Sequence, residues 1–183
     1  MRLRRRQYWQ FEPPDPTPSN EICRCRTKHP VKLMHALGEN PIHCIACNLE
    51  VPPKRLALDR DAVEAVAHWH YLYAAIYRLE LDSGSYEAWA TKQLKSLRSP
   101  VNALGLQACR EMQRSRPCYY ARFQTFAEQA RGFPLRCTKC GRRPSRFEGF
   151  RFPQSVCHCC SLIWWAAESD SLTPVQPRRR AGS

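Results

Sequence analysis

The chain has 183 residues, 43% of them hydrophobic, which is enough for one ordinary domain or two small ones around a packed core and excludes a disordered tail. Its formal net charge of +13 points to an anionic partner. Two zinc ions held by eight thiolates would lower that charge to +9, and seven arginines near the two ends carry most of the remainder, so composition alone does not establish nucleic-acid binding.

Segment 1–21 is a basic and then proline-rich arm. It opens with MRLRRRQYWQF, which lacks the apolar run of about 7 to 15 residues that a secretory signal needs, and EPPDPTPS at 12–19 predicts a linker. No stretch of the chain reaches the roughly 18 apolar residues of a membrane span. These features predict a cytoplasmic protein with no membrane partner, in a reducing compartment where paired cysteines usually bind metal.

Segment 22–52 is a first cysteine unit. Its candidate ligands are Cys23 and Cys25, followed after eighteen residues by Cys44 and Cys47. The closing pair has the C-x2-C spacing of a zinc ribbon, but the opening C-x-C is tighter than usual. We expect four thiolates to bind one metal ion here. Two alternatives remain open at this stage: disulfide pairing or no metal at all, and a ligand set in which one cysteine is replaced by His29, His35 or His43.

Segment 53–131 has the pattern of a helical bundle. Apolar residues recur at helical spacing over 61–81, where Asp61 and Glu64 form a possible capping box and Gly84 is the expected stop. A second helix is predicted over 86–97, and a third from Ser99 and Pro100 to about 115. A fourth is predicted over 119–130. The expected fold class is therefore α-rich with a small β content, a bundle of about four helices flanked by two zinc-ribbon units.

The same helical segment is rich in aromatic side chains of the kind found in protein interfaces. We expect most of them to lie in the core, with Trp69 and Trp89 joining the helices. If several are exposed together, they would instead favour a protein-binding adaptor, regulator or inhibitor. The residues concerned are Tyr71, Tyr73, Tyr77, Tyr86, Trp89, Tyr119, Tyr120, Trp164 and Trp165.

Segment 132–168 is a second cysteine unit, and segment 169–183 is a basic tail. The unit reads CTKC, sixteen residues, then CHCC, with a predicted hairpin over 141–156 between the two halves. Two C-x2-C turns supply the four soft ligands of tetrahedral zinc, and Gly141 provides the positive φ that such a turn needs. The expected ligands of this structural site are Cys137, Cys140, Cys157 and Cys160. Cys159 is an alternative to Cys160.

The two cysteine units resemble the zinc-ribbon superfamily, over about a third of the chain. The order of CRC, PIHCIACNLEVPP, a YRLELDSGSYEAWA helical block and a final four-cysteine unit is also similar to uncharacterised bacterial zinc-ribbon proteins. The resemblance implies a fold stabilised by zinc. It implies no activity and brings no catalytic residues.

Enzymatic activity is not expected. The chain lacks HExxH, the HxE of zinc deaminases, GxxxxGK[ST] and GxGxxG, and four thiolates leave zinc no open position for water. Cys109 and Cys118 are expected to be buried thiols, and Glu64 and His68 to share a hydrogen bond on a helix surface. We predict no catalytic residue, no small-molecule substrate and two structural zinc ions as the only cofactors.

The best candidate binding surface lies in the second cysteine unit, where arginines alternate with aromatic residues. Such a mixture can contact phosphates while stacking bases, although Phe150 could equally cover the helices. We predict a non-catalytic, zinc-stabilised protein that binds nucleic acid, DNA or RNA, through this surface and the basic arms near the two ends, with the protein-binding role as the alternative. The predicted nucleic-acid-binding residues are Arg136, Lys139, Arg142, Arg143, Arg146, Arg151, Phe147 and Phe150.

Overall fold

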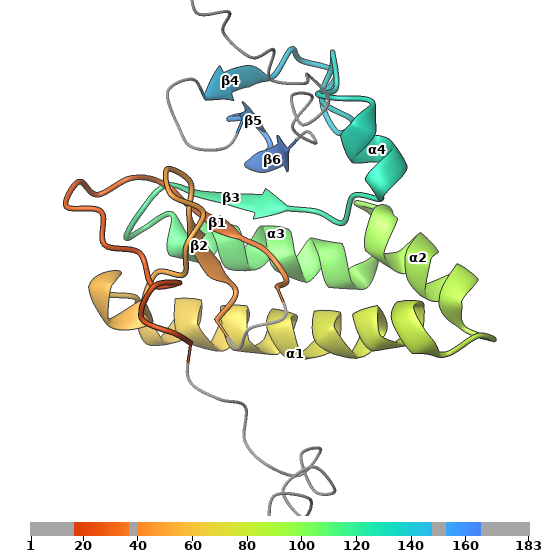
Figure 1. The fold of residues 1–183 in the computed structure, drawn as a ribbon, viewed down its shortest axis with the longest axis horizontal. Coiled ribbons are helices and arrows are strands. Elements are labelled where there is room, and N and C mark those ends of the chain that lie inside the picture. The colour runs from red at the N-terminus through yellow and green to blue at the C-terminus, as the bar shows by residue number, and fades with distance from the viewer. Residues whose placement is uncertain (1–16, 37–39, 148–152, 166–183) are drawn as a thin grey trace, which may run out of the picture.

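A mixed β-sheet with helices packed on one face organises the described part of the chain, residues 17–36, 40–147 and 153–165 of a computed structural model (Figure 1). The sheet is six-stranded. Its elements are β1 (Val31–Leu33), β2 (Ile42–Cys44), a 3-10 turn (Pro53–Arg55), α1 (Arg60–Asp82), α2 (Glu87–Lys95), α3 (Pro100–Met112), β3 (Cys118–Ala121), α4 (Phe126–Ala130), β4 (Ser145–Phe147), β5 (Gln154–Cys157) and β6 (Leu162–Trp165).

The strand order β2-β1-β3-β6-β5-β4 joins both cysteine units into one sheet. Strands β1, β3 and β6 run parallel to one another, and β2, β5 and β4 pair antiparallel with their neighbours. Strand β3 connects the two units, because Val31 of β1 lies opposite Cys118 and Leu162 of β6 lies opposite Tyr120. The two units are therefore not separate modules at the ends of a helical bundle.

The prediction of a four-helix bundle is wrong. Only α1, α2 and α3 are long helices among the described residues, and the predicted fourth helix over 119–130 is instead strand β3 followed by the five-residue α4. The adjacent tyrosines Tyr119 and Tyr120 point to opposite faces of the sheet and are both buried, as a strand between two partners requires. Helix α4 begins only after Thr125, which forms a capping box with Glu128.

The first three predicted helices are confirmed. Ser99 caps α3, since its Oγ accepts a hydrogen bond from the Asn102 backbone N–H at 3.4 Å. Helix α1 begins two residues earlier than expected, because Asp59, not Asp61, is its N-cap. It ends before Gly84, which has the expected positive φ of 60°. No helix in the described ranges is long and apolar enough to cross a membrane.

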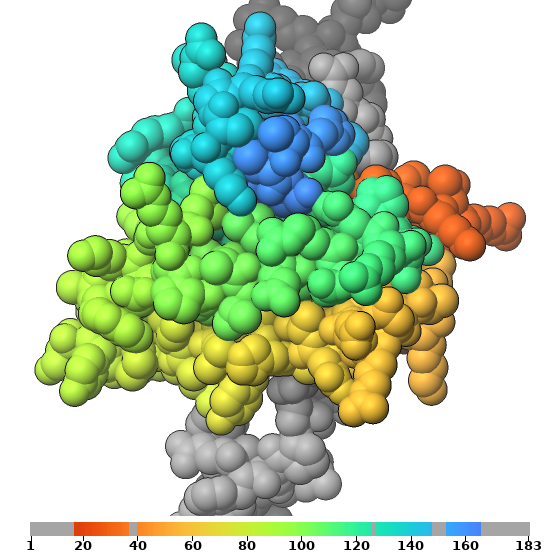
Figure 2. Space-filling view, turned by 180° about the vertical axis from the view of Figure 1, so that it is seen from behind, coloured from red at the N-terminus to blue at the C-terminus, as the bar shows by residue number. Residues whose placement is uncertain are grey.

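In Figure 1, α1 and α3 run side by side below β3, and the second cysteine unit lies above that strand. Figure 2 shows the same order of α1, α3 and the second unit from behind. Alternate strand residues face the helices and pack around Trp69 of α1, which is fully buried. The opposite face carries a smaller apolar cluster made of Ile45, Tyr119, Ala121, Val156 and Ile163. As predicted, Trp69 joins the helices, but Trp89 is about half exposed.

At Gly105, helix α3 lies close to both Tyr120 of β3 and Trp69 of α1. A Cβ atom on Gly105 would lie 2.3 Å from Cε2 of Tyr120 and 2.7 Å from Nε1 of Trp69. The Tyr120 hydroxyl donates to Oδ1 of Asn102 at 2.5 Å, and the Asn102 amide nitrogen lies 2.9 Å from each of three backbone carbonyls, two in the last turn of α2 and that of Ser96. This buried polar contact fixes α2 and α3 relative to β3.

Candidate metal centres

The eight predicted cysteine ligands come together in two groups of four. The sulfur atoms of Cys23, Cys25, Cys44 and Cys47 lie within 4.8 Å of one another, and so do those of Cys137, Cys140, Cys157 and Cys160. A tetrahedral zinc ion with Zn–S bonds of about 2.3 Å places its sulfurs roughly 3.8 Å apart, which these groups fit. All eleven cysteines are free thiols, so the structure gives no support to disulfide pairing.

The first group is built on a C-x2-C turn and a braced C-x-C turn. After β2 ends at Cys44, the chain reverses through Asn48, whose φ is 62° and whose N–H donates to the Cys44 carbonyl at 2.9 Å. The Arg55 guanidinium donates to the carbonyls of Cys23 and Cys25, the latter at 2.8 Å. Arg55 thus stabilises the tight opening turn. Sequence reasoning missed it, because an arginine eight residues beyond the last ligand has no motif that marks it.

The second group has two matching turns. Gly141 has the predicted positive φ, 71°, and its N–H donates to the Cys137 carbonyl at 2.8 Å. The Lys139 N–H donates to the Cys137 sulfur at 3.4 Å. Ser161 follows Cys160 with a φ of 52°, at the position that Asn48 occupies after Cys47. The closing turn therefore has the same form in both groups. A strand leads into the C-x2-C pair, one residue with a left-handed backbone conformation follows, and the chain then runs back beside the strand.

The alternative ligands lie outside the two groups. Cys159 is exposed, and Cys160 takes the place in the four-sulfur group. Within the described residues neither group includes a histidine. His43 is buried and is the cross-strand partner of Lys32, and burial followed by the Lys32 charge lowers its pKa to about 4.

The electrostatics of both groups favour binding a cation. The backbone N–H of Arg142 lowers the pKa of Cys140 to about 6, while burial raises the pKa of Cys157 to about 11. In the first group burial opposes ionisation of Cys23, but the Cys25 N–H and neighbouring thiols outweigh it and lower its pKa. Four close thiols cannot all ionise alone because their charges repel, and a bound divalent cation removes that obstacle. The chain thus contains two candidate metal-binding groups that stabilise its fold.

Both groups lie at the same edge of the sheet, where edge means the line of strand ends at which the parallel strands begin. Strands β2 and β5 run opposite to β1, β3 and β6, so Cys44 and Cys157 both lie where the three parallel strands begin. Two buried side chains connect the units across the sheet: Lys32 donates to Oε1 of Gln154 at 3.3 Å, and Nε2 of Gln154 donates to the Ile45 carbonyl at 2.8 Å. Burial lowers the pKa of Lys32 to about 8.

The predicted basic residues of the second unit are exposed. Arg136, Lys139, Arg142, Arg143 and Arg146 all project into solvent, and the Arg146 guanidinium lies 5.4 Å from the Phe133 ring centre. Phe147 is half-buried, with ring contacts to Tyr119 and His158, so part of its surface belongs to the core. Arg151 and Phe150 lie outside the described residues.

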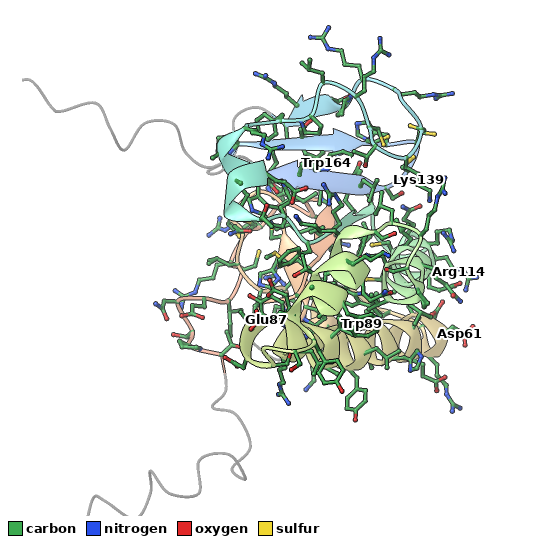
Figure 3. The ribbon with its side chains drawn as sticks, turned by 90° about the vertical axis from the view of Figure 1, so that its right-hand side faces the viewer. Asp61, Glu87, Trp89, Arg114, Lys139 and Trp164 are labelled. Atoms are coloured by element: carbon green, nitrogen blue, oxygen red, sulfur yellow. The ribbon has the colours of Figure 1, made fainter. Side chains whose placement is uncertain are left out.

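The end of α3 adds further basic side chains near the second group. Gln113 donates to Oγ of Ser161 at 2.6 Å, which holds this helix end against the turn that follows Cys160. Arg114 and Lys139 point outward on the same side of the molecule (Figure 3). Arg110 is exposed as well, while Arg114 is paired with Glu111 at 2.9 Å.

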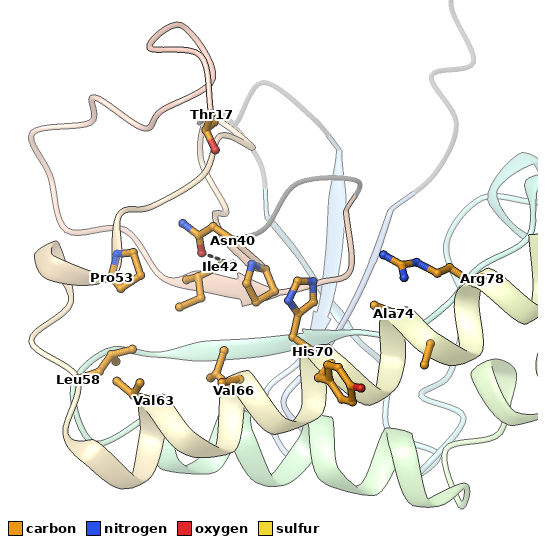
Figure 4. A pocket seen from close by; sticks show the side chains of 14 residues that line it. Thr17, Asn40, Ile42, Pro53, Leu58, Val63, Val66, His70, Ala74 and Arg78 are labelled. Atoms are coloured by element: carbon orange, nitrogen blue, oxygen red, sulfur yellow. Dashed lines mark hydrogen bonds between the residues drawn. The ribbon is translucent and has the colours of Figure 1, made fainter. Parts of the chain in front are cut away.

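A groove of about 800 Å³ lies elsewhere, between α1 and the edge strand β2 (Figure 4). Its lining is mostly apolar and includes Ile42, Leu58, Val66 and Ala74, with Tyr71 at 77% exposure beside it. The predicted hydrogen bond between Glu64 and His68 on the surface of α1 does not form as expected, because Glu64 binds Arg60 at 2.6 Å.

Comparison with known proteins finds no matching family model, no similar curated protein and no similar solved structure.

Proposed function

We propose that this chain is a non-catalytic, zinc-stabilised protein that binds nucleic acid through the sheet edge at which both metal groups lie. The observation that carries the proposal is the charge of the two segments that form this edge. Segments 22–30 and 131–147, which we call the basic edge, contain nine basic residues, all of them exposed, and no acidic one. Each zinc tetrathiolate contributes two negative charges, so both segments keep a positive net charge after metal binding.

The exposed arginines and lysine of the second unit would contact phosphates. Their exposure matters, because a cation already paired with an acid or buried in the core does not release counterions from nucleic acid. Two of the five, Arg142 and Arg143, follow the Cys140 turn directly, so the metal would hold their backbone in place. The zinc ions have a structural role in this proposal, because four thiolates leave no position for water or substrate.

The proposal is tested by replacing Arg142, Arg143 and Arg146 together with alanine. Each lost phosphate contact reduces the dependence of log K on log salt by about 0.7 to 0.9, so the slope should fall by about 2 to 3 and affinity at low salt by roughly 10 to 100-fold. Binding of a fluorescent single-stranded oligonucleotide and of a duplex, each across a salt series, measures both quantities and separates the two nucleic-acid classes.

A matched control removes the same charge from the helical side. Arg60, Lys92 and Arg98 are exposed and lie on or beside α1 and α2, and their triple alanine variant should retain nearly all of the binding. Metal content and thermal stability must match the parent chain in both variants. Equal losses in the two variants, or no binding by the parent chain at low salt, would contradict the proposal.

Protein binding is the second candidate, and the apolar groove beside α1 is the observation that favours it. The exposed rings of Tyr71, Tyr86 and Trp89 lie on the helical side, away from the basic edge. Under this alternative, Ala67→Arg in the groove abolishes the interaction, whereas the arginine triple variant leaves it intact. The two variants therefore give opposite results under the two functions.

A further inference from the structure

A second cavity lies at the opposite edge of the sheet, where the parallel strands end. We call it the strand-end pocket. Its volume is about 340 Å³, and it is lined by His35 after β1, Arg122 after β3 and Trp165 at the end of β6. Helix α1 closes it with Tyr77 and Glu80. The carboxyl ends of parallel strands are a common position for small ligands, and this volume is at the lower end of the range for ligand sites.

Aromatic rings form the walls of the strand-end pocket. The ring centres of His35 and Tyr77 are 4.8 Å apart, and those of Tyr77 and Phe123 are 6.3 Å apart. Tyr77, Phe123 and Trp165 are all half-buried, so each offers part of its ring to the cavity. Rings arranged in this way favour a flat ligand that stacks on them.

One carboxylate of the pocket has no partner in the described part of the chain. Glu80 is half-buried and forms no ion pair with any described residue. The Gln124 amide exchanges hydrogen bonds with the Trp165 backbone at 3.2 Å in both directions. Nε of Arg122 and Nδ1 of His35 have no hydrogen-bond partner among the described residues, but both atoms are buried and do not face the cavity. The pocket thus offers one unpaired carboxylate beside its aromatic walls.

The charges around the pocket disfavour a simple anion. The Arg122 charge is already compensated by Glu128 at 3.1 Å, and Glu80 adds a negative charge, so a free phosphate would be repelled. Burial lowers the pKa of His35 to about 4, so its ring is neutral at pH 7 and adds no positive charge. The stacking walls and the Glu80 carboxylate together suit a planar ring that carries N–H donors.

We propose that the strand-end pocket holds one unstacked nucleobase and prefers guanine. Guanine presents two adjacent N–H groups, at N1 and N2, to a carboxylate such as Glu80, while its ring stacks on the aromatic walls. Adenine presents a single amino group beside an acceptor nitrogen and would leave Glu80 partly unsatisfied. This inference rests on the proposed nucleic-acid function, to which it adds recognition of one base outside the basic edge.

The test uses the full chain with its metals bound and two soluble probes, GMP and AMP, in calorimetric titrations. GMP should bind with at least about tenfold higher affinity than AMP, as expected for one two-point hydrogen-bonded base contact. Glu80→Gln should remove that preference, because the amide presents one donor and one acceptor in place of two acceptors. Asp82→Asn is the matched control, since Asp82 is exposed on the same helix and does not line the pocket.

The outcomes separate this inference from the proposed function. Absence of saturable GMP binding, or a GMP preference that survives Glu80→Gln, would refute the base pocket. If oligonucleotides still bind in a manner that depends on Arg142, Arg143 and Arg146, the proposed function stands without it. GMP binding that is lost in Glu80→Gln, combined with no oligonucleotide binding, would refute the proposed function and support base recognition by the pocket.

Discussion

The closing turns of the two cysteine units have the same form, but the hairpins that carry them differ in how deeply their strands are buried. Strands β2 and β4 are the two outermost strands of the same sheet. All three residues of β2 are buried, and Ile42 and Cys44 belong to the core around Trp69. In β4, Ser145 and Arg146 are exposed, and Cys140 nearby is exposed as well.

The difference shows that the same cysteine turn can stabilise either core residues or an exposed surface, depending on which side chains the strands of its hairpin bear. The first unit places apolar residues against the helices, so metal binding there is coupled to global folding. The second unit also contributes Leu162 and Trp164 to the core around Trp69, but its ligand Cys140 and its edge strand are exposed. Metal binding there therefore orders an arginine-bearing surface as well as part of the core.

The largest expected effect comes from removing one ligand of each site separately. Cys44→Ser should destabilise the whole chain by several kcal/mol and lower the helix content, because Cys44 lies in the main core opposite Val31. Cys140→Ser should release metal from the second unit while α1 and α3 stay folded. Far-UV circular dichroism during thermal unfolding distinguishes them. Equal loss of helix in both variants would show that the two units do not differ in this way.

Gly105→Ala tests how tightly the first half is packed. The new methyl group would overlap Tyr120 and Trp69, both of which are fully buried, so we expect a loss of about 3 kcal/mol in the free energy of unfolding. Ala103→Gly on the exposed face of α3 is the control, with an expected loss of about 1 kcal/mol from helix propensity alone. Denaturant titration measures both, and equal losses would contradict the close approach of α3 to β3.

Gln154→Leu tests the connection between the two units. It leaves the Ile45 carbonyl and the Lys32 ammonium group buried without their partner, at an expected cost of about 2 kcal/mol. Adding Lys32→Met removes the uncompensated charge, so the double variant should be more stable than Gln154→Leu alone. A double variant at least as unstable as the sum of the single ones would argue against this contact.

The smallest effect concerns pH and the neutral ring of His35. Its folded pKa of about 4 lies below its unfolded value of 6.5, so the unfolded chain binds more protons between these values. The contribution of His35 to stability should therefore fall as pH drops from 6.5 towards 4, by about 1 to 2 kcal/mol after allowance for partial exposure, in addition to that of His43, whose pKa is also about 4. His35→Asn should reduce this slope in denaturant titrations at pH 7 and pH 5. An unchanged slope would place the proton uptake elsewhere.

Local spacing was sufficient to predict the cysteine groups and most helices. The C-x2-C turns, the positive φ of Gly141 and the Ser99 cap depend on neighbours within a few residues, which sequence patterns record. Strand β3 could not be predicted in this way, because CYYA is apolar on both faces and reads equally well as a buried helix turn. Its partners, β1 and β6, are distant in the chain.

The candidate site shows the same limit. The sequence indicated a basic surface beside the second cysteine group only, and the strand directions reveal that both groups share one edge. The hydrogen bond between Lys32 and Gln154 joins residues 122 positions apart, and no local pattern predicts it. The strand-end pocket likewise depends on three strands and one helix that meet only in the folded chain.

The most direct test of the account is the metal content of the chain purified without added metal. Elemental analysis should find two zinc ions per chain, and one in the Cys140→Ser variant. Two sites of four thiolates, one in each cysteine unit of the same sheet, require this stoichiometry. No bound metal in a folded parent chain, or a single ion that persists in Cys140→Ser, would contradict the account.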